Sequence, residues 1–149
     1  MTTQTKTTTK HTGFTEAEKA AMKERAAELK ADGKKGAKKA DDLQTQLDKI
    51  AEMEDADRVL AERIHTIVTT VAPDLDAKTW YGMPAYGRNG KAILFFKPAA
   101  KFGARYATLG FNDGVRLDDG TMWPTEYAIT TLTDADVATV EALVRRAAG

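Results

Sequence analysis

The stretch Thr79–Phe96 has the sequence TWYGMPAYGRNGKAILFF and decides the expected fold. Asn89-Gly90 lies near its middle, between two segments of small, apolar and aromatic residues. Asparagine tolerates, and glycine favours, the positive φ angles that both central positions of a two-residue type I′ turn require. We therefore predict a β-hairpin formed by residues 84–88 and 91–96.

A two-residue turn also predicts the register of the hairpin. The expected pairs are Arg88 with Lys91, Gly87 with Ala92, Tyr86 with Ile93, and Ala85 with Leu94. One face would then carry the bulky side chains of Tyr86, Ile93 and Phe95. The other would be nearly bare, with Ala85, Gly87 and Ala92, and with Leu94 and Phe96 at one end. A packed helix or a bound ligand could cover this face of small side chains.

The composition is that of a soluble globular protein of one domain, with 149 residues, 42% apolar and 30% charged. No apolar run approaches the roughly 20 residues of a membrane span, and the N-terminus shows no apolar signal segment. We therefore expect a cytoplasmic protein without membrane contact. The chain has neither cysteine nor serine and no P-loop, which excludes disulfides, cysteine-ligated metals and serine nucleophiles. We predict no catalytic residues and a non-enzymatic protein.

The formal charge of zero is unevenly distributed along the chain. Residues 1–40 carry ten Lys/Arg and five Asp/Glu, whereas residues 41–149 carry twelve and seventeen. We expect a disordered tail over 1–13, a capped helix and Lys/Gly-rich linker over 14–40, and a folded domain over 41–149. The basic arm lacks interleaved aromatic residues, so we do not expect nucleic-acid binding. Docking of this arm on an acidic body would give a homodimer if the body belongs to a second copy.

The order of the expected elements predicts the fold class. Helical patterns cover residues 15–31, 43–53 and 55–72, strands follow from 84 to 111 and again near 127–129, and Thr133 begins a final helix. This order predicts an α+β fold. An antiparallel β-meander containing the Asn-Gly hairpin would pack against N-terminal helices and a C-terminal helix as a two-layer α/β sandwich.

Residues 78–111 resemble the YdhG-like family, long described as a domain of unknown function. The most specific match is the WYGMP sequence at Trp80–Pro84. The helix over Arg58–Val71 and the closing helix after Thr133 are also similar to that family. One member is described as a frataxin-like intracellular iron chaperone. The resemblance therefore implies an α/β sandwich, Fe²⁺ as a weakly held cargo, and an iron-acceptor protein as partner. The family pattern carries no metal-ligand motif, so no site residue is transferred.

The residues themselves restrict how iron could be held. Without cysteine, and with His65 as the one histidine of the folded domain, a site would consist of oxygen ligands, which suit weak and exchangeable Fe²⁺ binding. The candidate metal ligands are Glu52, Glu54, Asp55, Asp57, Asp118 and Asp119. The alternative is that these carboxylates cap helices and form turns.

Large aromatic and apolar side chains indicate a second function. A small-molecule or protein binding module could use an aromatic-lined pocket around residues 80–96. The candidate pocket residues are Trp80, Tyr81, Met83, Tyr86, Phe95 and Trp123. The alternative is that these side chains are ordinary core residues of a sheet.

Overall fold

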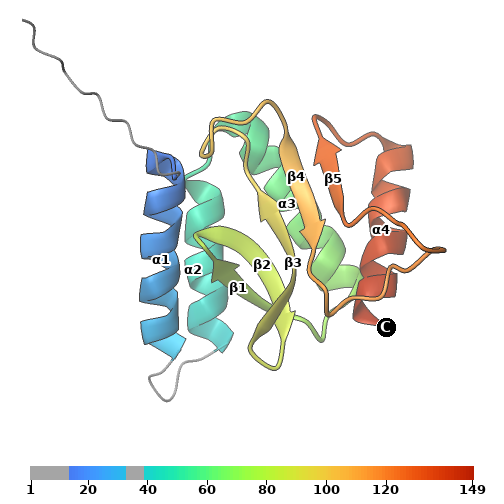
Figure 1. Ribbon diagram of the computed structural model, residues 1–149, viewed down its shortest axis with the longest axis horizontal. Coiled ribbons are helices and arrows are strands. Elements are labelled where there is room, and N and C mark those ends of the chain that lie inside the picture. The colour runs from blue at the N-terminus through green and yellow to red at the C-terminus, as the bar shows by residue number, and fades with distance from the viewer. Residues whose placement is uncertain (1–13, 33–38) are drawn as a thin grey trace, which may run out of the picture.

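The computed structural model describes residues 14–32 and 39–149 (Figure 1). The helices are α1 (Glu16–Asp32), α2 (Lys39–Ala51), α3 (Asp55–Val71) and α4 (Asp134–Ala148). The strands are β1 (Asp76–Trp80), β2 (Met83–Arg88), β3 (Lys91–Lys97), β4 (Ala107–Phe111) and β5 (Glu126–Ile129). The tail predicted to be disordered and most of the predicted linker lie outside these residues.

The five strands form one antiparallel meander in the order β1-β2-β3-β4-β5, and the helices pack on it. This arrangement confirms the predicted α+β fold with two layers. In Figure 1, α3 lies behind the sheet and α4 stands beside β5, while α1 and α2 stand side by side at the β1 end. Within residues 14–32 and 39–149, no helix has the length and hydrophobicity needed to cross a membrane.

The main core lies between one sheet face and α3 and α4. It forms because apolar residues recur on one side of α3, where Leu60, Ile64 and Val68 are buried, and because burying them removes apolar surface from water. From the sheet, Leu94 and Phe96 are buried completely against these helices.

The predicted capped helix within residues 14–40 and the predicted helix start at Thr133 are both confirmed. Thr15 and Glu18 exchange hydrogen bonds of 3.0 Å at the start of α1, and Thr133 and Asp136 form the same capping box at α4. Asp55, one of the carboxylates for which helix capping was the alternative to metal binding, does not cap α3, because Glu54 holds the N-cap position and Asp55 is the first helical residue.

The helix α2 buries a different face from the one predicted. Its pattern of Leu43, Leu47 and Ile50 favours a leucine stripe, yet both leucines are exposed, whereas Gln46 and Ile50 are buried. The amide Nε2 of Gln46 donates to the backbone oxygens of Lys78 (2.9 Å) and Ala85 (2.8 Å). A polar side chain is thus buried here because it satisfies two backbone carbonyl groups of the sheet.

The Asn-Gly turn is confirmed, but the predicted register holds only next to it. Asn89 and Gly90 have φ angles of 55° and 80°, as a type I′ turn requires. Beyond the first two pairs a β-bulge follows, so Tyr86 pairs with Leu94 instead of Ile93. Because one extra residue reverses the alternation of faces, Phe95 lies on the face opposite Tyr86.

A second two-residue turn, which the sequence pattern did not predict, connects β1 to β2. Trp80 pairs with Met83, and the intervening Tyr81 and Gly82 have φ angles of 55° and 75°. A bulky residue with positive φ is unusual, so the sequence Tyr81-Gly82 does not predict this turn. Within the region from 84 to 111 that was expected to form strands, β3 ends at Lys97 and β4 begins only at Ala107.

Candidate functional site

A groove of about 420 Å³ lies on the sheet face opposite α3 and α4, beside the first turns of α1. We call it the aromatic groove. Its large apolar lining residues are Phe14, Met22, Trp80, Tyr81, Met83, Phe95 and Phe102. Its charged lining residues are Glu18, Lys97 and Glu126. The groove therefore combines apolar walls with a few polar side chains, as small-molecule sites commonly do.

The aromatic rings of the groove are held in fixed relations to one another. The centroid of Trp80 lies 4.9 Å from that of Tyr81, edge to face, and 5.2 Å from that of Phe95. The ammonium group of Lys97 stands 5.1 Å from the ring centroid of Phe102, within the range of a cation–π interaction. These contacts position the flat faces of several rings around one open space.

The structure brings together only part of the predicted pocket set. Trp80, Tyr81, Met83 and Phe95 line the aromatic groove. Tyr86 does not, because the bulge turns it into the main core, and Trp123 packs against that core as well. Tyr86 and Trp123 therefore belong to or pack on the core of the sheet, which was the stated alternative to a pocket.

Tyr86 is paired with His65, the one histidine of the expected folded domain. The hydroxyl of Tyr86 lies 2.8 Å from Nδ1 of His65, and the two rings are tilted against each other. Burial raises the pKa of the Tyr86 hydroxyl, and burial lowers the pKa of the His65 imidazole. A protonated tyrosine and a neutral histidine therefore share this hydrogen bond at neutral pH.

The candidate metal ligands have separate structural surroundings. Asp57 is 5% exposed, and its two carboxylate oxygens accept hydrogen bonds from the backbone amides of Ala99 (3.1 Å) and Ala100 (2.9 Å). The carboxylate thereby ties the start of α3 to the loop after β3. Asp55 is exposed and forms an ion pair with Arg58 at 2.8 Å.

The remaining candidate ligands do not form one cluster. Glu52 and Glu54 line a pocket of about 410 Å³ together with Asp57, but Lys49 and Lys101 line the same pocket. Asp118 and Asp119 are exposed in the segment between β4 and β5. Among the residues that the structure describes, no three His, Asp or Glu side chains come together as metal ligands.

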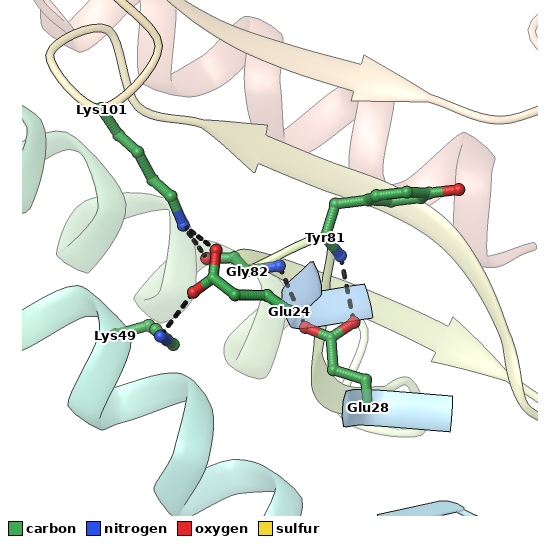
Figure 2. A network of polar contacts seen from close by, with 6 residues as sticks. All are labelled: Glu24, Glu28, Lys49, Tyr81, Gly82 and Lys101. Carbon is green, nitrogen blue, oxygen red and sulfur yellow. Dashed lines mark hydrogen bonds and ion pairs between the residues drawn. The ribbon is translucent and has the colours of Figure 1, made fainter. Parts of the chain in front are cut away.

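A polar network beside the groove was not expected from the sequence. Figure 2 shows two glutamates of α1 reaching toward the β1–β2 turn. The carboxylate of Glu28 accepts hydrogen bonds of 3.0 Å from the backbone amides of Tyr81 and Gly82. The carboxylate of Glu24 accepts from Nζ of Lys49 at 2.6 Å and from Nζ of Lys101 at 2.7 Å. We call this arrangement the carboxylate clamp.

The charges of the carboxylate clamp are mutually compensated. Burial acts to raise the pKa of Glu24, but hydrogen bonds from Lys101 and Lys49 outweigh it, so the pKa lies below its usual value. The hydrogen bond to Glu24 raises the pKa of Lys49. Both groups are therefore ionised at neutral pH. The one sequence signal for this network was the spacing of Glu24 and Glu28, which places two carboxylates one helical turn apart.

Several groove residues also escaped the sequence analysis. Phe14 and Met22 come from the N-terminal helix region, and Phe102 comes from the loop before β4. The sequence signal for Phe14 was a large apolar residue just before an alanine-rich helix, and the signal for Met22 was a large apolar residue within that helix. Their position over the sheet depends on tertiary contacts, which a local pattern does not contain.

Comparisons of the chain with protein-family models, with curated proteins and with solved structures found no match. The similarity of Trp80–Pro84 to the YdhG-like family therefore stays a prediction.

Proposed function

We propose that this protein is a non-enzymatic binding module whose aromatic groove takes a small, flat, largely apolar molecule with a polar end. The observation that carries the proposal is the convergence of Trp80, Tyr81, Met83 and Phe95 around one open space. Sheet faces rich in apolar residues are normally covered by another layer. Here the volume of about 420 Å³ falls in the range of ligand pockets.

The chemistry of the lining favours this ligand class. Ring faces stack well on planar molecules, and each such contact contributes roughly 0.5–1.5 kcal/mol beyond the area that it buries. Lys97 and Glu126 stand at the same groove and offer an ammonium and a carboxylate to a polar substituent. The lining contains no histidine and no pair of buried acids, so binding fits it better than catalysis.

The two tryptophans of the chain supply an internal test of this proposal. In W123F the only tryptophan is Trp80 in the groove, and in W80F it is Trp123 on the main core. With anilinonaphthalene sulfonate as a flat anionic probe, we expect saturable quenching of Trp80 in W123F and little change in W80F. Removing the ring of Phe102 in F102A should weaken probe binding about tenfold, which is about 1.4 kcal/mol.

The control is T66A, an exposed substitution on α3 away from the groove, which should leave the affinity for the probe unchanged. Equal quenching of both single-tryptophan variants, or no saturable quenching in W123F, would contradict ligand binding in the aromatic groove.

We also propose, as the second function, that the protein carries Fe²⁺ to an acceptor protein, as membership in the YdhG-like family would imply. The supporting observation is that Glu52, Glu54 and Asp57 line one pocket. This proposal ranks second because Lys49 and Lys101 share that pocket, and positive charges repel a cation.

An anaerobic calorimetric titration tests the iron proposal. We expect saturable micromolar Fe²⁺ binding that Mg²⁺ does not match, and at least tenfold weaker binding in E52Q/E54Q. The matched control D118N/D119N removes two exposed carboxylates elsewhere and should bind Fe²⁺ normally. Binding that Mg²⁺ equals, or that E52Q/E54Q leaves unchanged, would remove this proposal.

A further inference from the structure

The helix α1 is held on the domain by charged contacts more than by apolar burial. Ala21 is the only buried side chain among those described in α1, at 4% exposure. Leu29 is 54% exposed, and Met22 is also exposed. A helix with so little apolar contact gains little from the hydrophobic effect on docking. The carboxylate clamp therefore supplies the specific contacts that hold α1 in place.

The receptor side of the clamp is a built anion site. Tyr81 and Gly82 both have positive φ, and their two amides converge on the one carboxylate of Glu28 (Figure 2). Consecutive backbone amides in such a turn form a concave site for an anion. A β-carbon on Gly82 would collide with the carboxylate of Glu24 and the ammonium of Lys101, so the close approach needs glycine.

Two lysines extend this site by one helical turn. Lys49 comes from α2 and Lys101 from the loop after β3, and both ammonium groups meet at Glu24. Lys101 also donates to the backbone oxygen of Gly82 at 3.3 Å. The domain thus presents two positions for carboxylates, matched to residues i and i+4 of a helix.

The packing around the clamp is open. A pocket of about 410 Å³ and another of about 220 Å³ are both lined by Glu24 and Lys49. The first lies toward Gly82 and Met53, and the second toward Thr79. Protein interiors are normally close-packed. These two spaces therefore indicate that α1 and the rest of the domain are complementary in charge at this contact but do not fit closely in shape.

We propose that the Tyr81–Gly82 turn, Lys49 and Lys101 form a docking site for an acidic helix of a partner protein, and that α1 is the resident occupant that this partner displaces. The partner helix carries two carboxylates four residues apart, with a small residue three positions before the first, as Ala21 precedes Glu24. Charge complementarity between the clamp and acidic side chains supports this docking site, whether or not a ligand occupies the aromatic groove.

A labelled copy of α1 tests the site in the full-length chain. The probe is a fluorescein-labelled peptide of residues 14–32, and binding is followed by anisotropy. In the wild type, the tethered α1 competes at an effective concentration near the millimolar range. In E24A/E28A this competition is lost, so the peptide should bind at least about tenfold more tightly. Raising NaCl from about 50 mM to about 500 mM should weaken that binding, because salt screens the ion pairs.

Two controls make the test decisive. A peptide with glutamine in place of Glu24 and Glu28 should not bind, and adding K49M/K101M to E24A/E28A should abolish binding of the normal peptide. Thermal unfolding and hydrogen exchange check that each variant is folded and that the α1 amides lose protection in E24A/E28A.

Three results would overturn the proposal. They are equal peptide binding by the wild type and E24A/E28A, equal binding of the glutamine peptide, and unchanged protection of α1 in E24A/E28A. The wild type could also form a concentration-dependent dimer that E24A/E28A abolishes. That result would overturn the assignment to a partner protein, because the occupant of the site would then be a second copy of this chain.

Discussion

Replacing Asp57 with alanine is expected to lower the free energy of unfolding by about 3 kcal/mol. The carboxylate is buried and accepts from the amides of Ala99 and Ala100. Its removal loses two charge-assisted hydrogen bonds and leaves two amides without their partner, and each loss of this kind costs roughly 1–3 kcal/mol. For a domain of this size the midpoint of thermal unfolding should fall by roughly 10 °C.

The matched control for this prediction is D55A, which removes an exposed carboxylate two residues earlier. Its ion pair with Arg58 is a surface contact, so the midpoint should change by no more than about 2 °C. Differential scanning calorimetry of both variants measures the contrast. If D57A and D55A unfolded at the same temperature, the carboxylate of Asp57 would not be a structural tie and would again be a strong candidate metal ligand.

Replacing Gly110 with alanine is expected to cost about 2 kcal/mol of stability and to disturb the aromatic groove. Gly110 in β4 pairs with Phe95 in β3, and the ring of Phe95 lies over the glycine. A β-carbon at position 110 would collide with that ring, which is buried and cannot simply swing away. Because Phe95 also lines the groove beside Trp80, its displacement should change the near-ultraviolet circular dichroism of the aromatic residues.

G114A provides the matched control, because a β-carbon on Gly114 would meet no other atom within 4 Å. This substitution should leave both the unfolding midpoint and the probe affinity of the groove close to those of the wild type. A G110A variant as stable as G114A would mean that Phe95 has room to move, and the groove would then be less rigid than its ring contacts indicate.

The fold was predictable wherever one local pattern determined the outcome. Asn89-Gly90 predicted its turn because these two residue types accept the positive φ angles that the turn requires. Thr15 and Thr133 predicted helix starts because their side chains form capping hydrogen bonds with residues close in sequence. The apolar stripe of α3 is similarly a local periodicity. These features need no knowledge of what lies across the core.

The site was only partly predictable, because its features depend on contacts between distant segments. The bulge after Gly87 sends Tyr86 and Phe95 to opposite faces, and alternation alone could not reveal the extra residue. The positive φ of Tyr81 is tolerated in a turn whose amides bind Glu28, more than fifty residues earlier in the chain. Carboxylates such as Asp57 looked like ligands because a sequence does not show which backbone amides will face them.

One helix contributes to both proposed sites, and this sharing has a thermodynamic consequence. Met22 of α1 forms part of the wall of the aromatic groove, while Glu24 and Glu28 occupy the carboxylate clamp. A small molecule resting against Met22 would favour the docked helix, whereas a partner that displaces α1 would take that wall away. By linkage, each would weaken the other's binding by the same factor. The two ligands would therefore be mutual antagonists, with α1 as the element that communicates between them.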